Sequence, residues 1–212
     1  MTARAAPRPA PQQALERYYQ LHSRIYDATR WSFLFGREEI LRRAATVAPA
    51  PRRILEVGCG TGRNLVSLRR RFPQAHITGL DLSEQMLAIA AGKVRDSHTT
   101  LLRRAYSGPV HAADEPFDLI LFSYALSMFN PGWEQALDAA HADLAGGGCV
   151  AVVDFSHSRF AWFRRWMAVN HVRMEGHLWP GLTARFTALM DDRLPAYGSL
   201  WHYGFFLGRK EA

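Results

Sequence analysis

The feature that most constrains the fold is a glycine-rich turn between a short apolar strand and a helix. Residues 53–57 read as a strand, and Gly58, Gly60 and Gly62 follow at alternate positions before a helical pattern over 62–72. Glycines let the chain turn sharply, and they let a ligand approach the backbone with no Cβ in the way. The N–H groups of the helix N-terminus then face that ligand. We therefore expect an α/β fold with a binding site at this turn.

An acidic residue follows at an informative distance. The next predicted strand, 75–81, ends at Asp81, which lies 21 residues after Gly60. At about that separation a carboxylate accepts the hydroxyl protons of a ribose. A dinucleotide fingerprint would place its third glycine at Arg63, so the turn suits a ligand with a carboxylate tail better than a pyrophosphate. The alternative is a tight structural turn beside a surface aspartate.

Strands and helices alternate through the rest of the chain. Further strands are predicted at 99–103, 117–123, 149–155 and 200–207, and further helices at 37–48, 83–94, 133–144 and 159–174. This order predicts a mostly parallel sheet with helices on both faces. The chain has 212 residues, of which 48% are apolar. That length can bury a core without disulfides, and one domain is the simplest organisation.

The N-terminal segment and the cysteines suggest a cytoplasmic protein. Residues 1–13 contain three prolines and no apolar run, so we expect a disordered lead-in rather than a secretory signal, followed by a helical cap over 14–50. No stretch of 18 apolar residues is long enough to span a membrane. Cys59 and Cys149 lie far apart, which argues against a disulfide framework or a metal site.

The positive charge lies on the flanks of the chain. The formal net charge is +7, yet residues 54–155 carry 8 basic and 11 acidic side chains. Residues 1–53 carry 10 basic and 4 acidic side chains, and residues 156–212 carry 8 and 4. Basic flanks rich in aromatic residues point to an anionic membrane surface or to nucleic acid, or else to an ordinary solvated face beside an aromatic core.

The segment Glu56–Gly62 together with Asp81 resembles the cofactor site of Rossmann-like S-adenosylmethionine-dependent methyltransferases. The strand Phe117–Ser123 and the turn Leu144–Gly148 resemble that family's fourth strand and the start of its fifth. The resemblance covers residues 53–155. It implies a seven-stranded sheet, an N-terminal helical lid, and S-adenosylmethionine as cofactor with S-adenosylhomocysteine as product, without a metal.

The resemblance also assigns site residues. Glu56 would position the site, the glycine turn would hold the methionine part, and Asp81 would bind ribose. Leu82 and Met86 would flank adenine, and Cys59 is expected to be a small apolar filler within the turn. The family often has an Asp-Ala pair beside adenine, whereas this chain has Arg104-Ala105. The expected cofactor-binding residues are Arg37, Glu56, Gly58, Cys59, Gly60, Gly62, Asp81, Leu82, Met86, Ala105, Tyr106 and Ser123.

The flanks resemble a narrower group. The segments Tyr26–Arg37 and Trp201–Lys210 are similar to those of the betaine-lipid N-methyltransferases, which convert diacylglyceryl-homoserine to its trimethylated form. Phosphatidylethanolamine N-methyltransferases share a shorter part of the first segment. This resemblance implies that the methyl acceptor is the amine of a lipid headgroup.

Methyl transfer from a sulfonium requires a nucleophile held in line with the S–CH₃ bond. Tyr26, Tyr124 and Asp154 are the candidate catalytic residues, because Tyr26 should fold over the cofactor and the other two follow predicted strands. Asp154 is expected to end its strand and to bind an ammonium or accept its proton. The alternatives are helix packing for Tyr26 and a helix N-cap for Asp154.

Candidate substrate or membrane contacts follow the predicted fifth strand. The segment Ser158–Met167 intersperses three arginines among four large aromatic residues, as an interfacial helix or an ordinary amphipathic helix would. The candidates are Trp31, His157, Trp162, Arg164, Arg165 and Trp166.

Three classes of function remain open. The leading hypothesis is a cytoplasmic lipid N-methyltransferase, peripheral at the inner face of an anionic membrane. The second is a methyltransferase of a soluble small-molecule amine or hydroxyl, and the third is a non-catalytic, cofactor-binding membrane-associated protein. Nucleic acid is not expected as a partner, because the chain has no separate RNA-binding module and no Asn-Pro-Pro-Tyr-type motif.

Overall fold

The computed structural model describes residues 33–110 and 115–211 and contains a seven-stranded sheet. The strands are β1 (Arg53–Val57), β2 (His76–Asp81), β3 (Thr99–Arg103), β4 (Phe117–Ser123), β5 (Leu144–His157), β6 (Thr187–Ala196) and β7 (Trp201–Arg209). Their order across the sheet is β3-β2-β1-β4-β5-β7-β6. The first five run parallel, β7 is antiparallel to β5, and β6 is antiparallel to β7.

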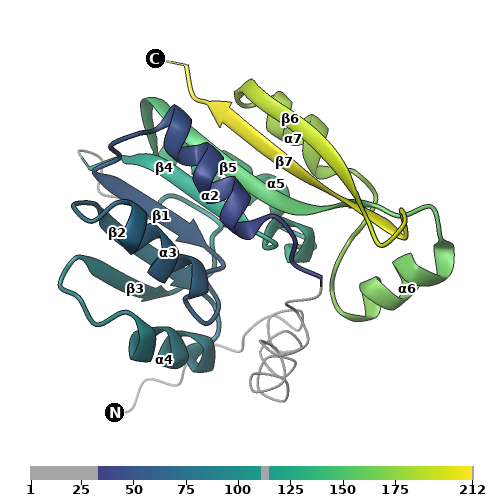
Figure 1. Cartoon of the computed structure of the whole chain (residues 1–212), viewed down its shortest axis with the longest axis horizontal. Helices are drawn as coiled ribbons and strands as arrows, with labels where there is room; N and C mark the ends of the chain where they lie inside the picture. Colours follow the sequence, from purple (N-terminus) through teal and green to yellow (C-terminus); the bar gives the residue numbers. More distant parts are fainter. Residues whose placement is uncertain (1–32, 111–114, 212) are drawn as a thin grey trace, which may run out of the picture.

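Helices cover both faces of this sheet (Figure 1). The helices are α2 (Arg37–Val47), α3 (Arg63–Arg71), α4 (Glu84–Lys93), α5 (Trp133–Asp143), α6 (Ala161–Val169) and α7 (Leu178–Thr183), with one 3₁₀ turn, η1 (Leu126–Met128). Helices α2, α3 and α4 lie on one face, α5 and α7 lie on the other, and α6 stands beyond the carboxyl ends of the parallel strands (Figure 1). The predicted α/β fold with a mostly parallel sheet is confirmed.

The central strands are buried on both faces, which explains their continuous apolar runs. Successive side chains of a strand point to opposite faces. In β4, Leu119 and Leu121 accordingly join the core under α2 and α3, whereas Ile120 and Phe122 join the core under α5 and α7. Because β1, β2, β4 and β5 run parallel, their carboxyl ends meet at one edge of the sheet, and this edge positions the candidate site.

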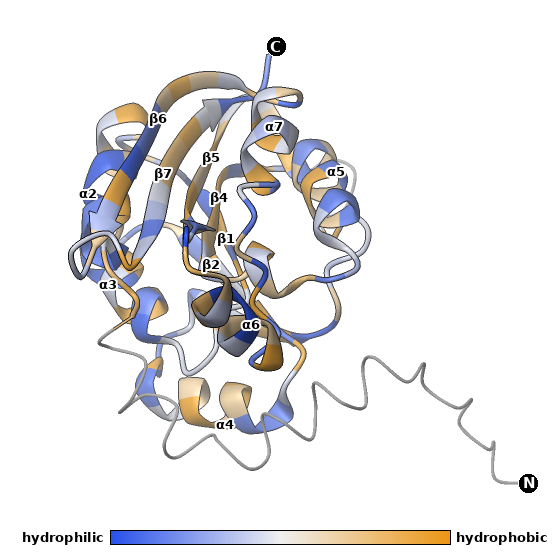
Figure 2. Ribbon diagram, turned by 90° about the vertical axis from the view of Figure 1, so that its right-hand side faces the viewer, coloured by the Kyte–Doolittle hydropathy of each residue, from blue (hydrophilic) through white to orange (hydrophobic). Residues whose placement is uncertain are grey.

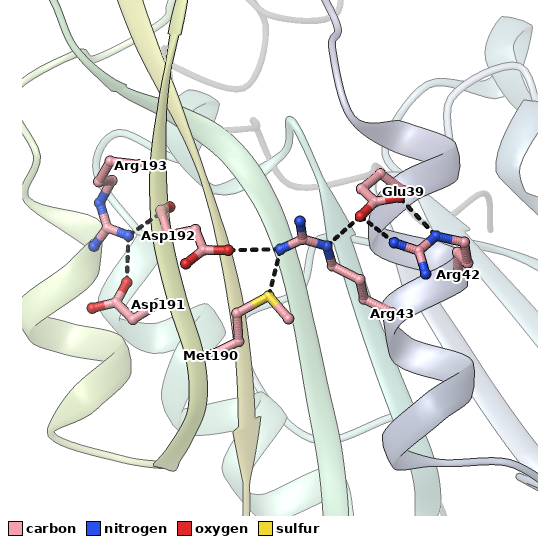
Figure 3. Close-up of polar contacts among 7 residues, drawn as sticks. All are labelled: Glu39, Arg42, Arg43, Met190, Asp191, Asp192 and Arg193. Atoms are coloured by element: carbon pink, nitrogen blue, oxygen red, sulfur yellow. Dashed lines mark hydrogen bonds and ion pairs between the residues drawn. The ribbon is translucent and has the colours of Figure 1, made fainter.

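The helix before the core is tied to the C-terminal edge strand by ion pairs (Figure 3). Arg43 of α2 binds Asp192 of β6 at 2.7 Å and Glu39 one turn earlier, and its guanidinium lies over the Phe205 ring at 4.7 Å. Hydrogen bonds from Arg42 and Arg43 lower the pKa of Glu39 to about 2. Exposed pairs of this kind contribute about 0–1 kcal/mol each, so they orient α2 relative to β6 more than they stabilise the fold.

Two predicted boundaries are wrong. The helix predicted over 159–174 spans only Ala161–Val169, because the Ser158 hydroxyl accepts the N–H of Phe160 before it begins. It ends where His171 adopts a left-handed φ of 60° and the N–H of Val172 turns back to the Met167 carbonyl. The strand predicted over 149–155 is longer, spanning Leu144–His157.

Two elements were missed. Strand β6 is an edge strand whose side chains are mostly exposed, so it lacks the apolar pattern of a buried strand. Helix α7 contains Pro180 and Gly181, both of which disfavour helix in a sequence reading. The expected lead-in over 1–13 and the first part of the expected cap, 14–32, lie outside the described residues. The described part of that cap, α2, packs on the sheet beside β5 and α3.

Candidate functional site

The glycine turn after β1 is open where a ligand would approach. Gly58, Gly60 and Gly62 all have positive φ angles, of 72°, 54° and 77°. A Cβ on Gly58 would lie 2.8 Å from that of Ala125, so this position requires glycine for packing as well. A Cβ on Gly60 would have no atom within 4 Å. The space beside Gly60 is therefore available to a ligand, as the predicted role of the turn requires.

Asp81 holds this turn against the end of β2. One carboxylate oxygen accepts the N–H of Gly60 at 2.8 Å, and the other accepts the N–H of Ser83 at 2.9 Å. Burial raises the pKa of Asp81, and these backbone N–H groups oppose that rise because they stabilise the carboxylate. Each carboxylate oxygen has a further lone pair, so Asp81 retains the capacity to accept hydroxyl protons.

Glu56 is a buried carboxyl group with one oxygen left over. Its Oε1 accepts the side-chain amide N–H of Asn64 at 2.8 Å, whereas its Oε2 has no partner. Burial raises the pKa of Glu56 to about 8, although Asn64 and the nearby charge of Arg37 oppose the rise. A buried polar atom without a partner is costly, so this oxygen marks a place where a bound cation would be stabilised.

Arg37 begins α2, and its positive charge reaches the same place. That charge acts to lower the pKa values of both Glu56 and Tyr124. A cation and an unpaired carboxyl group therefore lie beside the glycine turn, and they complement the carboxylate and ammonium of an amino-acid moiety. The donor set fits the methionine part of S-adenosylmethionine at Arg37 and Glu56, and its ribose at Asp81.

Hydrogen bonds to the backbone fix the segments that are predicted to border adenine. The Ser83 hydroxyl accepts the N–H of Met86 at 3.3 Å and so caps α4, as predicted, with Met86 fully buried. The N–H of Arg104 donates to the Asp81 carbonyl at 3.1 Å, which brings the chain after β3 back to the end of β2. Ala105 therefore lies next to a residue that contacts Asp81. The roles of Leu82, Met86 and Ala105 toward adenine stay predictions.

Tyr106 and Cys59 have their side chains in packed surroundings. The Tyr106 hydroxyl donates to Asp143 of α5 at 2.7 Å, and burial raises the pKa of this phenol. Cys59 is buried within the turn, and burial likewise raises the pKa of its thiol. Cys59 therefore has the apolar environment expected of a filler, and Tyr106 has a structural partner away from the turn.

The end of β4 carries an unpaired hydroxyl and a strained tyrosine. Ser123 is buried, and its Oγ has no hydrogen-bond partner. Tyr124 has a φ of 57°, which is unfavourable for a bulky residue and is typical of functional sites. Its hydroxyl donates to the Phe35 carbonyl at 2.8 Å, and burial raises its pKa well above the usual value. In this structure the Tyr124 hydroxyl is therefore a hydrogen-bond donor to the segment before α2, and its catalytic role stays a prediction.

Asp154 differs from the prediction in position and in partners. It lies inside β5, three residues before the strand ends, and is fully buried. Its oxygens accept the N–H groups of Ser127 at 3.1 Å and of Phe155 at 2.8 Å. Asp154 therefore binds η1 and does not cap the helix that follows its strand. Burial raises its pKa to about 6, against the hydrogen bonds from Ser127.

The predicted substrate side is aromatic and partly exposed. His157 stacks on His202 with ring centroids 4.3 Å apart, and burial and this neighbour lower the pKa of His157. On α6, Trp162 and Trp166 are 62% and 49% exposed. Figure 2 shows that α6 itself contains both apolar and polar residues. Arg165 is exposed, while Arg164 donates to the Ser158 carbonyl at 2.6 Å.

Two candidates, Tyr26 and Trp31, lie outside the described residues. Conversely, Asn64 and Ser127 were not predicted, although they donate hydrogen bonds to the buried carboxyl groups of Glu56 and Asp154. Asn64 has a faint signal in the sequence, because it is a polar residue in the first turn of a helix whose next positions are apolar. In the described part of the chain, no helix is long and apolar enough to cross a membrane.

Comparisons with known proteins agree with this geometry. Residues 54–148 match the family described as a methyltransferase domain. The chain is 35% identical over 115 residues to trans-aconitate 2-methyltransferase from Variovorax paradoxus, covering 54% of this chain and 42% of that protein. It is 32% identical over 135 residues to demethylmenaquinone methyltransferase from Thermus thermophilus, covering 61% and 60%.

A solved structure extends the likeness in fold. The N-methyltransferase NodS from Bradyrhizobium japonicum, in complex with S-adenosylhomocysteine, superposes with a TM-score of 0.69 at 21% identity, covering 83% of this chain and 86% of that one. Residues 54–148 thus match a methyltransferase domain, and the strand order of the sheet and the geometry of the glycine turn agree with that match.

The match is not to whole proteins. The chain spans about 42% to 60% of the length of the curated relatives described above. Their names refer to trans-aconitate and demethylmenaquinone and not to betaine lipids. They therefore do not support the narrower resemblance drawn from the flanking segments, and they favour the small-molecule alternative.

Proposed function

We propose that this chain is an S-adenosylmethionine-dependent methyltransferase whose acceptor is a small molecule bound beyond the carboxyl ends of β4 and β5. The observation that carries the proposal is the unpaired Oε2 of Glu56, buried beside an open glycine turn that Asp81 holds in place. S-Adenosylmethionine, when bound, supplies a methyl group on a positively charged sulfur. The protein's contribution is to bind and orient.

Each of three site residues binds a part of the cofactor that its charge complements. Asp81 accepts ribose hydroxyl protons, Glu56 in its ionised form receives an ammonium, and Arg37 receives a carboxylate. Ser123, with its unpaired hydroxyl at the end of β4, is available to the acceptor or to the sulfonium side of the cofactor. Methyl transfer then depends mainly on holding the acceptor's lone pair in line with the S–CH₃ bond.

The test separates cofactor binding from turnover. Calorimetry with S-adenosylhomocysteine should give one site per chain, and methyl-labelled S-adenosylmethionine should transfer label to a member of a panel of small carboxylic acids, quinols and amines. Absence of S-adenosylhomocysteine binding would refute the proposal. Binding without transfer to the panel or to lipids would favour the non-catalytic alternative.

A second candidate function is methylation of a lipid headgroup amine, with diacylglyceryl-homoserine or phosphatidylethanolamine as acceptor. It is favoured by the two exposed tryptophans of α6 beside Arg165, since tryptophan and arginine suit the interface of an anionic membrane. This candidate would make the protein peripheral at the cytoplasmic membrane face. It predicts label transfer into these lipids and sedimentation with vesicles that contain phosphatidylglycerol. Failure of both would remove it without affecting the first proposal.

A further inference from the structure

An apolar groove of about 450 Å³ lies between α6 and the turn that joins β6 to β7. It is formed by segments far apart in the sequence, and its aromatic lining residues are Phe33, Trp162, Phe163, Trp166, Tyr197 and Trp201. Trp201 forms the centre of the lining, with the Phe33 ring stacked at 5.2 Å and the Phe163 ring at 5.4 Å. The groove is thus a built surface with a rigid base.

The rim of the groove is exposed although it is aromatic. Trp162, Trp166 and Tyr197 are 62%, 49% and 57% exposed. Tyr197 is held there by a turn in which Tyr197, Gly198 and Ser199 all have positive φ angles. Exposed aromatic side chains that rim an apolar hollow mark a binding surface. Trp201 itself is 1% exposed, so the aromatic base of the groove is part of the packed core.

The charges beside the groove are positive. Arg159, Arg164 and Arg165 come from α6 and the residues before it, and none of them forms an ion pair within the described residues. The Arg164 charge also acts on Glu175, but the pKa of Glu175 is lowered mainly by Arg173, whose guanidinium binds this carboxylate at 2.7 Å. Aromatic walls also bind organic cations, but three neighbouring guanidinium groups oppose a cation here.

We propose that this groove binds the apolar chain of an anionic amphiphile, whose acidic head group is held by the arginines of α6. The inference deepens the proposed function, because it assigns an alkyl-chain carboxylic acid as the class of molecule that the substrate side accepts. The groove lies near Tyr124, a candidate catalytic residue: the Phe35 ring is 6.2 Å from the Trp201 ring that lines the groove, and the Phe35 carbonyl accepts the Tyr124 hydroxyl at 2.8 Å.

The test uses dodecanoate at concentrations at which it is monomeric, and dodecyltrimethylammonium as the cation with the same chain. Binding is followed by tryptophan fluorescence on the full chain saturated with S-adenosylhomocysteine, and 12-bromododecanoate provides a quencher on the chain. We expect one site, strong quenching by the brominated acid, and binding of dodecanoate about tenfold tighter than that of the cation. Affinity should rise about tenfold from decanoate to dodecanoate, because two more methylene groups are buried.

Variants assign the site. Trp162→Ala and Trp166→Ala should each weaken dodecanoate about tenfold, and Arg165→Gln should weaken it severalfold while leaving the cation unchanged. Leu189→Ala is the matched control, because Leu189 is 43% exposed on β6 and does not line the groove. Both tryptophans are exposed enough for truncation to leave the core intact, and circular dichroism checks this.

Three outcomes would overturn the inference: equal affinity for the cation, unchanged binding by both tryptophan variants, or binding to phosphatidylglycerol vesicles without binding of monomeric dodecanoate. The last outcome would identify the groove as a membrane contact. The dodecanoate titration is repeated without S-adenosylhomocysteine, so that the two proposals fail separately: dodecanoate binding by a protein that does not bind S-adenosylhomocysteine refutes methyl transfer and leaves the groove assignment standing.

Discussion

Two buried carboxyl groups of this sheet, at the end of β1 and inside β5, have opposite hydrogen-bonding environments. Glu56 has one bonded oxygen and one without a partner, and burial raises its pKa to about 8. Asp154 is equally buried, but both its oxygens accept backbone N–H groups, and its pKa rises only to about 6. The difference suggests that an unsatisfied carboxyl group serves a ligand, whereas a satisfied one serves the fold.

The largest expected effect is on cofactor affinity and comes from Asp81, which lies beside the same glycine turn as Glu56. Asp81→Ala should weaken S-adenosylhomocysteine about 100-fold, because it removes the carboxylate proposed to accept two ribose hydroxyl protons and leaves the Gly60 N–H without its partner. Calorimetry measures this loss. Asp118→Ala is the control, since Asp118 accepts the N–H groups of Arg52 and Arg53 at the opposite end of β1. Near-normal affinity in Asp81→Ala would refute the ribose assignment.

Glu56→Gln should weaken S-adenosylhomocysteine about tenfold, because the amide keeps an acceptor for Asn64 but loses the negative charge. In the wild type, affinity should rise from pH 6 to 8 as the carboxyl group ionises. The cofactor-free protein should lose stability over the range from the unfolded pKa of 4.5 up to about 8, because the folded state favours the protonated form.

Urea unfolding at several pH values checks the second half of this prediction. Glu56→Gln should reduce the loss of stability between pH 6 and 8, whereas the loss below pH 6 should partly remain, because the raised pKa of Asp154, about 6, contributes there. An identical pH profile in the wild type and the variant would show that Glu56 is not the group that titrates.

Asp154→Asn tests whether the second carboxyl group contributes to stability and not to cofactor binding. It should change S-adenosylhomocysteine affinity less than threefold, but should lower the free energy of unfolding by about 1–3 kcal/mol, because the amide N–H₂ opposes a backbone N–H. If η1 borders the acceptor, turnover should fall more than cofactor affinity. A tenfold loss of affinity in this variant, measured beside Glu56→Gln, would contradict the distinction between the two carboxyl groups.

The smallest effect is expected at Tyr124→Phe. The variant loses the hydrogen bond to the Phe35 carbonyl, so thermal or urea unfolding should show a loss of about 1 kcal/mol. Because the phenol is a neutral donor, the pH dependence of turnover should not change. A shifted pH profile would instead give Tyr124 a role in proton transfer.

Much of the cofactor edge was predictable because its determinants are local. The spacing of Gly58, Gly60 and Gly62 indicates the turn, and the acid predicted from its distance to Gly60, Asp81, lies at the turn, where it accepts the Gly60 N–H at 2.8 Å. Its role toward ribose stays a prediction. The buried strands were predictable because two-sided burial requires continuous apolar residues. Strand β6 was not, because an edge strand can remain polar and still pair through its backbone.

By itself, the sequence determined the order of strands and helices from α2 to β5, the glycine turn and the acid beside it, because each depends on residues close in the chain. Only the tertiary structure decided which carboxyl group is left unpaired and where the aromatic groove lies. Asn64 and Ser127 reach their carboxyl partners through the packing of helices on the sheet. Phe33, Trp162 and Trp201 line one groove although they lie before α2, on α6 and on β7, which pairs with β5. Contacts of this kind depend on how distant segments pack, which local sequence patterns do not encode.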